Sequence, residues 1–166
     1  MSATSATPKP LEAKPSGTRG KQSLRLWLRL LACENLIEQT VRARLRIAFD
    51  ITLPQFDVLS ELEHAGSALT MSQLSQKLMV SNGNVTGVVD RLERDGHVRR
   101  QASATDRRVQ YIELTDQGVA LFREMASEHE RWIENLFGDL SASEIRILIN
   151  GLGKAKDSIA AHLDSN

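Results

Sequence analysis

The sequence holds very little of what secreted, disulfide-bonded or membrane-embedded proteins need. Cys33 is the single cysteine among 166 residues, so no internal disulfide can form, which fits a reducing cytoplasm. No apolar run approaches the roughly 18 residues of a membrane span. The N-terminal residues also lack the basic start and apolar stretch of a secretory signal. We therefore expect a cytoplasmic globular protein with no membrane partner.

Signals of catalysis are missing as well. The sequence contains no Ser/His/Asp set, no glycine-rich phosphate loop and no paired carboxylates in a glycine-rich frame, so neither an enzyme nor a cofactor is expected. The histidines lie far apart, with no second ligand at metal spacing: His64, His97, His129 and His162. No metal site is expected from this pattern.

Charge is balanced over the whole chain but not locally. The 21 basic and 21 acidic side chains give a net charge of zero, which taken alone argues against binding to nucleic acid. A binding face, however, needs only its own stripe of charge. Between Arg91 and Arg108, six arginines stand against three acidic residues, so this segment is locally basic.

Most of the chain has the apolar periodicity of helices. Residues 1–22 are the exception: they are rich in Ser, Thr, Pro and Lys and are predicted to be a disordered basic tail. From residue 23 to 49, apolar residues follow two helical tracks, which predicts a helix buried between partners. Later helices are predicted to start at Thr115 and at three capping boxes, namely Thr52 with Gln55, Thr70 with Gln73 and Ser141 with Glu144. The expected order is four helices, a β-hairpin and two helices.

The segment Met79–Gly96, MVSNGNVTGVVDRLERDG, is predicted to be the fourth helix, with Ser81 as its N-cap. Its apolar residues share one face: Val85, Val88, Val89 and Leu92. The opposite face carries poor helix formers, including glycines that each cost about 1 kcal/mol relative to alanine. A helix that approaches DNA closely needs small residues and amide or hydroxyl groups, which explains this composition.

Short capped helices followed by a hairpin predict a winged helix-turn-helix, in a fold that is mainly α with a small β-hairpin wing. The wing strands are expected at residues 97–103 and 108–115. Arginines at the tip are predicted to enter a minor groove, oriented by a neighbouring aspartate. The residues predicted to contact DNA are Ser81, Asn82, Gly83, Asn84, Thr86, Arg91, Asp106, Arg107 and Arg108.

Two stretches resemble a known family. TDRRVQYIELTDQG (105–118) looks like the Asp-x-Arg wing and Leu-Thr-x-x-Gly exit of the MarR (multiple antibiotic resistance regulator) family, and VSNGNVTGVVDRLERDGHVRR (80–100) is similar to its recognition helix and first wing strand. The resemblance covers nearly the whole chain after residue 22. It implies a homodimer with a helical dimerisation region (23–49 and 116–166) and a winged helix-turn-helix domain (50–115) on a palindromic double-stranded operator.

The stretch LRLWLRLLACENLIEQTVRARLR (24–46) resembles family members linked to aromatic-acid catabolism of the hydroxycinnamate type. This resemblance implies a repressor that is released by a small aromatic acid or its coenzyme A thioester. Such a ligand needs an apolar slot with polar anchors. The candidates are Trp27, Leu30 and Phe56 for the slot, Arg25 or Arg29 for the carboxylate, and Arg42, Arg44 and Arg46 for thioester phosphates. The competing interpretation places Trp27 in the core and the arginines on a solvated face.

Two other functions remain open. Cys33 would act as a redox sensor if its thiol were exposed and reactive, although a helical cysteine among leucines is more often a packing residue. A winged helix can also serve for protein contacts. Clustered arginines at both the recognition helix and the wing tip favour DNA over that alternative.

Overall fold

The computed structural model describes residues 17–103 and 109–163. The chain divides into two compact units, residues 1–38 and 39–166. The first unit holds most of helix α1 (Arg19–Phe49), which begins before the predicted start at residue 23. Residues 1–16 of the expected tail lie outside the described residues. Large apolar side chains of α1 are exposed in the single chain, among them Leu24, Trp27 and Leu36.

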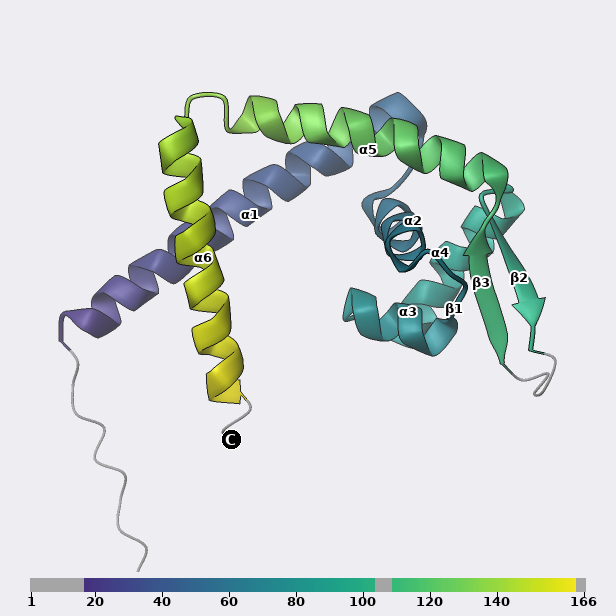
Figure 1. Cartoon of the computed structure of the whole chain (residues 1–166), viewed down its shortest axis with the longest axis horizontal. Coiled ribbons are helices and arrows are strands. Elements are labelled where there is room, and N and C mark those ends of the chain that lie inside the picture. Colours follow the sequence, from purple (N-terminus) through teal and green to yellow (C-terminus); the bar gives the residue numbers. More distant parts are fainter. Residues whose placement is uncertain (1–16, 104–108, 164–166) are drawn as a thin grey trace, which may run out of the picture. The chain divides into compact units, whose positions relative to one another are not determined.

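The second unit carries the remaining elements in the predicted order (Figure 1). They are α2 (Leu53–Ala65), β1 (Leu69–Thr70), α3 (Met71–Leu78), α4 (Asn82–Arg94), β2 (Val98–Ala102), β3 (Gln110–Leu114), α5 (Asp116–Leu136) and α6 (Ala142–Leu163). The mainly α fold with a small β wing is therefore confirmed. Strand β1 was not predicted, because two residues are too few to show a strand period.

Helix starts follow the local sequence signals. Thr52 and Gln55 form a reciprocal capping box, in which the Thr52 backbone N–H donates to Gln55 Oε1 at 2.9 Å. The predicted boxes at Thr70 and Ser141 form in the same way. Each box satisfies backbone donors that the first helical turn leaves without partners. Ser81 occupies the N-cap position of α4, but its side chain makes no capping hydrogen bond.

The wing is a three-stranded antiparallel sheet in the order β1-β3-β2, with β2 and β3 side by side in Figure 1. Ile112 in the central strand pairs with Leu69 of β1 and with Arg100 of β2. Its side chain is fully buried, whereas the neighbouring Tyr111 is exposed. Buried and exposed side chains therefore alternate along β3, so that one face of the wing packs on the helical core.

Helix α4 is held to the core through the face that the sequence predicted. Val85, Val89 and Leu92 are each at most 1% exposed and lie against α2 and α3. Burying a side chain of this size stabilises a fold by about 1.5–3 kcal/mol. This anchorage leaves the opposite face of α4 free for another role.

Met79, in the turn between α3 and α4, adopts a left-handed conformation (φ 55°) with its side chain 93% exposed. That conformation favours glycine. We expect Met79→Gly to raise the free energy of unfolding by about 1 kcal/mol, measured by urea denaturation at fixed protein concentration. Met79→Ala is the matched control and should change little, since it keeps the Cβ atom. If the parent protein and both variants were equally stable, the left-handed backbone at Met79 would not be strained.

Candidate nucleic-acid interface

The outer face of α4 has the composition and exposure that contact with a groove requires. Gly83, Gly87, Asp90 and Arg94 are all exposed, opposite the buried valines. Asn84 and Thr86 flank this face and are exposed too, as is Ser81 at the N-terminal end. Asn82 begins the helix, but its side chain lies outside the described part of the chain. The predicted partition of α4 into an anchored and an outward face is thus observed.

Neither crowding by the described residues nor backbone conformation requires the glycines of α4. A Cβ atom added at Gly83 or Gly87 meets nothing within 4 Å, and neither residue has a positive φ. Alanine would therefore fit at both positions and favour the helix by about 1 kcal/mol. Open space at both positions is compatible with a partner whose surface comes close to the helix backbone.

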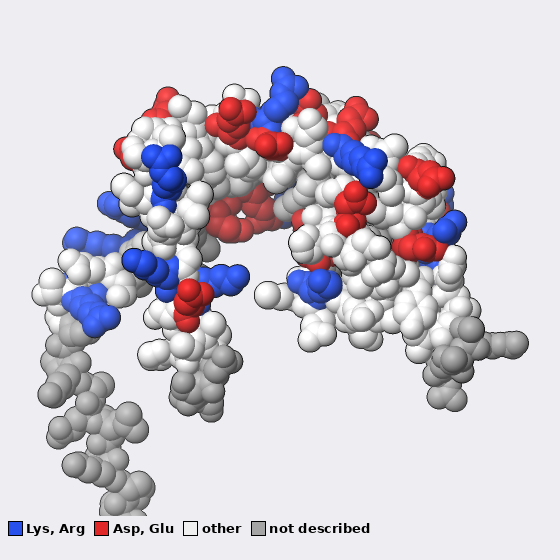
Figure 2. All heavy atoms as spheres, viewed as in Figure 1, with Lys and Arg blue, Asp and Glu red and all other residues white. Residues whose placement is uncertain are grey.

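Ion pairs neutralise much of the local positive charge that the sequence suggested. Arg91 Nε lies 2.9 Å from Asp95 Oδ2, and Arg99 Nε lies 2.6 Å from Glu113 Oε1. Arg100 pairs with both Asp90 and Glu93. Arg94 is exposed and forms no ion pair with the described residues. Figure 2 likewise shows basic and acidic side chains intermingled along α5.

The predicted wing-tip contacts Asp106, Arg107 and Arg108 lie in residues 104–108, outside the described residues. The base of the wing is well defined. The Thr115 hydroxyl donates to the Gly96 carbonyl at 2.7 Å and accepts from the Gly118 N–H at 3.0 Å. The wing exit is thereby tied to the end of α4, which fixes where the hairpin emerges.

The candidate effector residues belong to both units of the chain. In the first unit, Trp27 is 58% exposed, Arg25 and Arg29 are exposed, and Leu30 is half-buried. In the second unit, the buried ring of Phe56 lies 5.7 Å from that of Phe122 and 5.2 Å from that of His129, centroid to centroid. Burial lowers the pKa of His129 below its ordinary value. The slot formed by these residues stays a prediction.

Two of the arginines considered for thioester phosphates have partners in the second unit. The Arg44 guanidinium lies 5.8 Å from the centroid of the Trp132 ring, a cation–π distance. Arg46 Nη1 lies 3.3 Å from Asp50 Oδ1. Sequence reasoning did not foresee that Arg46, Thr52 and Gln55 lie beside α4. The capping-box pattern of Thr52 and Gln55 predicts only where helix α2 begins.

The metal, membrane and redox alternatives differ in what the described residues show. In residues 17–103 and 109–163 no group of three or more His, Cys, Asp or Glu side chains is placed to hold a metal ion. None of the described helices has the length and apolarity to cross a membrane. Cys33 is exposed on α1 as a free thiol.

Comparisons with known proteins agree with this geometry. A model described as MarR family matches residues 49–109. The chain is 34% identical to the HTH-type transcriptional regulator PecS of Dickeya dadantii (strain 3937) over 111 residues. The aligned residues make up 64% of this chain and 67% of the relative. The chain is 30% identical over 138 residues to the transcriptional activatory protein BadR of Rhodopseudomonas palustris (strain ATCC BAA-98 / CGA009), covering 81% and 78%. Streptococcus pneumoniae FabT, solved in complex with DNA, superposes with a TM-score of 0.70 at 28% identity over 84% of this chain and 98% of that chain.

Proposed function

We propose that this chain, which belongs to the MarR family of winged helix-turn-helix transcriptional regulators, is a cytoplasmic homodimeric repressor released from its operator by a small aromatic ligand. The observation that carries the proposal is the outward face of α4. Two glycines there face open space among the described residues, and polar side chains flank them. The N-terminal end of a recognition helix meets base edges in the major groove.

Exposed apolar residues on α6 support a homodimer. This helix has no buried residue in the single chain, and its large apolar side chains are exposed: Ile147, Leu148, Ile149, Leu152, Ile159 and Leu163. An apolar surface of this kind marks a protein interface. A second copy of the chain would cover it and present two recognition helices to the two halves of a palindrome.

The second unit offers a place for an aromatic ligand in an apolar cavity of about 380 Å³, lined by residues that include Pro54, Val58, Val80 and Val85. Such a volume accommodates a small aromatic acid. The predicted slot residue Phe56 does not line this cavity, and its ring is buried against those of Phe122 and His129. The relative BadR is named an activatory protein, so activation instead of repression is the second form of the proposal.

Selection of operator duplexes from a random pool, followed by a salt titration, tests DNA binding. With 6–10 phosphate contacts, we expect affinity to fall by about 10³–10⁵ between 50 and 200 mM salt. Footprints should show two half-sites with centres about 10 base pairs apart. Failure to enrich any duplex, or an affinity independent of salt, would overturn the proposal.

Release of the operator tests the effector. We expect a hydroxycinnamate-type acid or its coenzyme A thioester to dissociate the complex, because a releasing ligand must prefer the conformation that does not bind DNA. Free coenzyme A serves as the control for the thioester. Release by peroxide in the parent protein but not in Cys33→Ser would instead assign a redox sensor. If neither the acid nor the thioester releases the operator, the proposal of an aromatic effector is wrong.

A further inference from the structure

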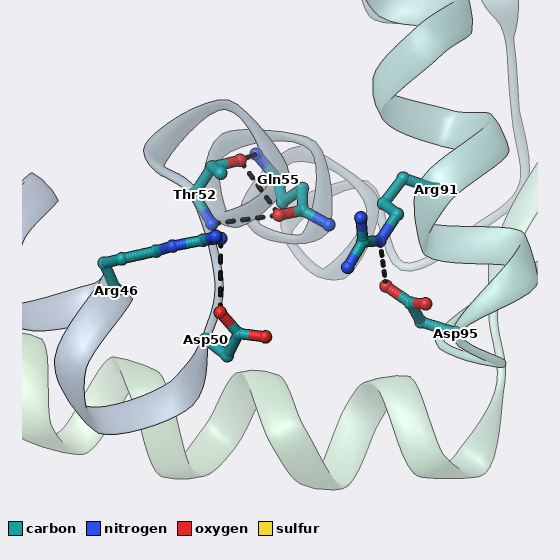
Figure 3. Close-up of polar contacts among 6 residues, drawn as sticks. All are labelled: Arg46, Asp50, Thr52, Gln55, Arg91 and Asp95. Atoms are coloured by element: carbon teal, nitrogen blue, oxygen red, sulfur yellow. Dashed lines mark hydrogen bonds and ion pairs between the residues drawn. The ribbon is translucent and has the colours of Figure 1, made fainter.

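One flank of α4 borders a cavity of about 260 Å³ that gathers hydrogen-bond donors from three helices of the second unit. Its lining includes Arg46 near the end of α1, Thr52 and Gln55 at the start of α2, and Asn84, Gly87 and Arg91 of α4. Figure 3 shows the two arginines and the capping pair of α2 around this site. The cavity adjoins the DNA-facing side of α4, since Gly87 belongs to both.

Gln55 directs an unpartnered donor into the cavity. The residue is only 5% exposed, and its Oε1 accepts the Thr52 backbone N–H and the Thr52 hydroxyl, both at 2.9 Å. A backbone N–H can only donate, so this contact fixes the oxygen toward Thr52 and turns the amide nitrogen away. That nitrogen donates to no described residue, and Figure 3 shows it pointing toward Arg91. The nitrogen is not among the buried unpartnered side-chain atoms of the described residues, so it is accessible from the cavity and can donate to an acceptor bound there.

The arginines add charged donors that aspartates hold in place. Arg91 uses Nε for Asp95, and the Asp95 carboxylate, with a smaller effect of Asp50, raises the pKa of Arg91 above its ordinary value. Arg46 uses Nη1 for Asp50. Each guanidinium has five N–H donors, so most remain available. The remaining N–H donors of two arginines and one amide N–H suit an anion with several acceptor oxygens, while Asp50 and Asp95 balance the net charge of the arginines.

We propose that this cavity seats one backbone phosphate of the operator DNA, held by Arg46, Gln55 and Arg91. The inference rests on the proposed DNA binding and extends the interface from α4 to the end of α1 and the start of α2. When a helix occupies the major groove, the sugar–phosphate strands pass along its flanks, where backbone contacts fix the register. Arg91 and Asn84 lie on such a flank, and the open space at Gly87 leaves the approach clear.

Removing the outermost donor is the first test. We expect Arg46→Ala to weaken operator binding about tenfold and to reduce the slope of log affinity against log salt by about 0.9, the value for one lost phosphate contact. Arg131→Ala is the matched control, because Arg131 is an exposed helical arginine paired with Glu128 of its own helix at 2.7 Å. It should leave both the affinity and the slope unchanged.

Two further variants separate phosphate binding from folding. Gln55→Glu keeps the acceptor that caps α2 but replaces the amide donor by a negative charge, so operator binding should fall at least about tenfold in a folded protein. Asp50→Asn removes a negative charge beside Arg46, and asparagine tolerates the left-handed backbone at this position (φ 53°). We expect this variant to bind the operator more tightly.

A scan with neutral methylphosphonates then locates the contact. One position in each half-site should weaken binding of the parent protein but not of Arg46→Ala. If the parent protein binds with a salt dependence while Arg46→Ala and Gln55→Glu bind equally well, the phosphate seat is wrong and the proposed function stands. If these variants alter only release by a free carboxylate, the cavity holds a small anion and the inference is again overturned. Absence of any DNA binding by the parent protein removes both proposals.

Discussion

Gly118→Ala is expected to remove most of the stability of the second unit. A Cβ atom at this position would lie 1.9 Å from the backbone oxygen of His97 and 2.9 Å from its carbonyl carbon. Backbone atoms cannot rotate away as a side chain can. The His97 oxygen also accepts the Thr115 N–H at 3.1 Å. The first turn of α5 must therefore move away from the end of α4, at a cost of about 4 kcal/mol or more.

Urea denaturation at fixed protein concentration, followed by circular dichroism, measures this loss. Gly87→Ala is the matched control, because it is the same substitution in a helix but points into open space. It should raise the free energy of unfolding by about 0.5–1 kcal/mol. If Gly118→Ala unfolds at the same urea concentration as the parent chain, the close approach to His97 is absent in solution.

The same glycine shows how far sequence reasoning reaches. The Leu-Thr-x-x-Gly pattern resembles that of a known family, and the cap at Thr115 follows from local chemistry. The need for glycine at position 118 arises from His97, which is distant in the sequence and becomes a neighbour only when β2 and β3 pair. Local signals therefore predicted where α5 begins but not what its first turn touches.

Charge shows a similar limit. The arginines from Arg91 to Arg108 make a basic segment by number, but a count along the chain does not show which of them form ion pairs. Arg99 meets Glu113 across the hairpin, and Arg100 reaches back to Asp90 and Glu93 on α4. These pairs join elements that are apart in sequence, so the electrostatic potential around α4 and the wing depends on the fold. Among the described arginines of this segment, Arg94 alone keeps its charge uncompensated.

Short-range patterns were the reliable ones. The apolar face of α4 and the capping boxes depend on residues three or four positions apart, and all of them appear as predicted. The sequence does not predict the cavity beside α4, because its residues come from three helices. The local pattern identifies Gln55 as a capping residue, but it does not show that the amide nitrogen of Gln55 points toward Arg91 of another helix.

Gly87→Glu is expected to abolish operator binding while leaving the fold intact. The position is exposed and open, and glutamate favours a helix over glycine by about 0.5–1 kcal/mol, so stability should rise slightly. A carboxylate on the outward face of α4 would meet the phosphates that line the groove. Like charges brought together at an interface cost several kcal/mol, which corresponds to a loss of at least about a hundredfold in affinity.

Gly87→Lys is the control that separates charge from size. Lysine is longer than glutamate and has a similar helix propensity, but its charge attracts phosphate. Fluorescence anisotropy with a selected operator should show that lysine weakens binding less than glutamate does, because both side chains crowd the close approach at Gly87 but only the carboxylate also repels phosphate. If both variants lose binding equally, the loss of affinity comes from the size of the added side chain and not from its charge. If Gly87→Glu binds like the parent chain, the outward face of α4 does not meet DNA, because no groove would accept a carboxylate there without cost.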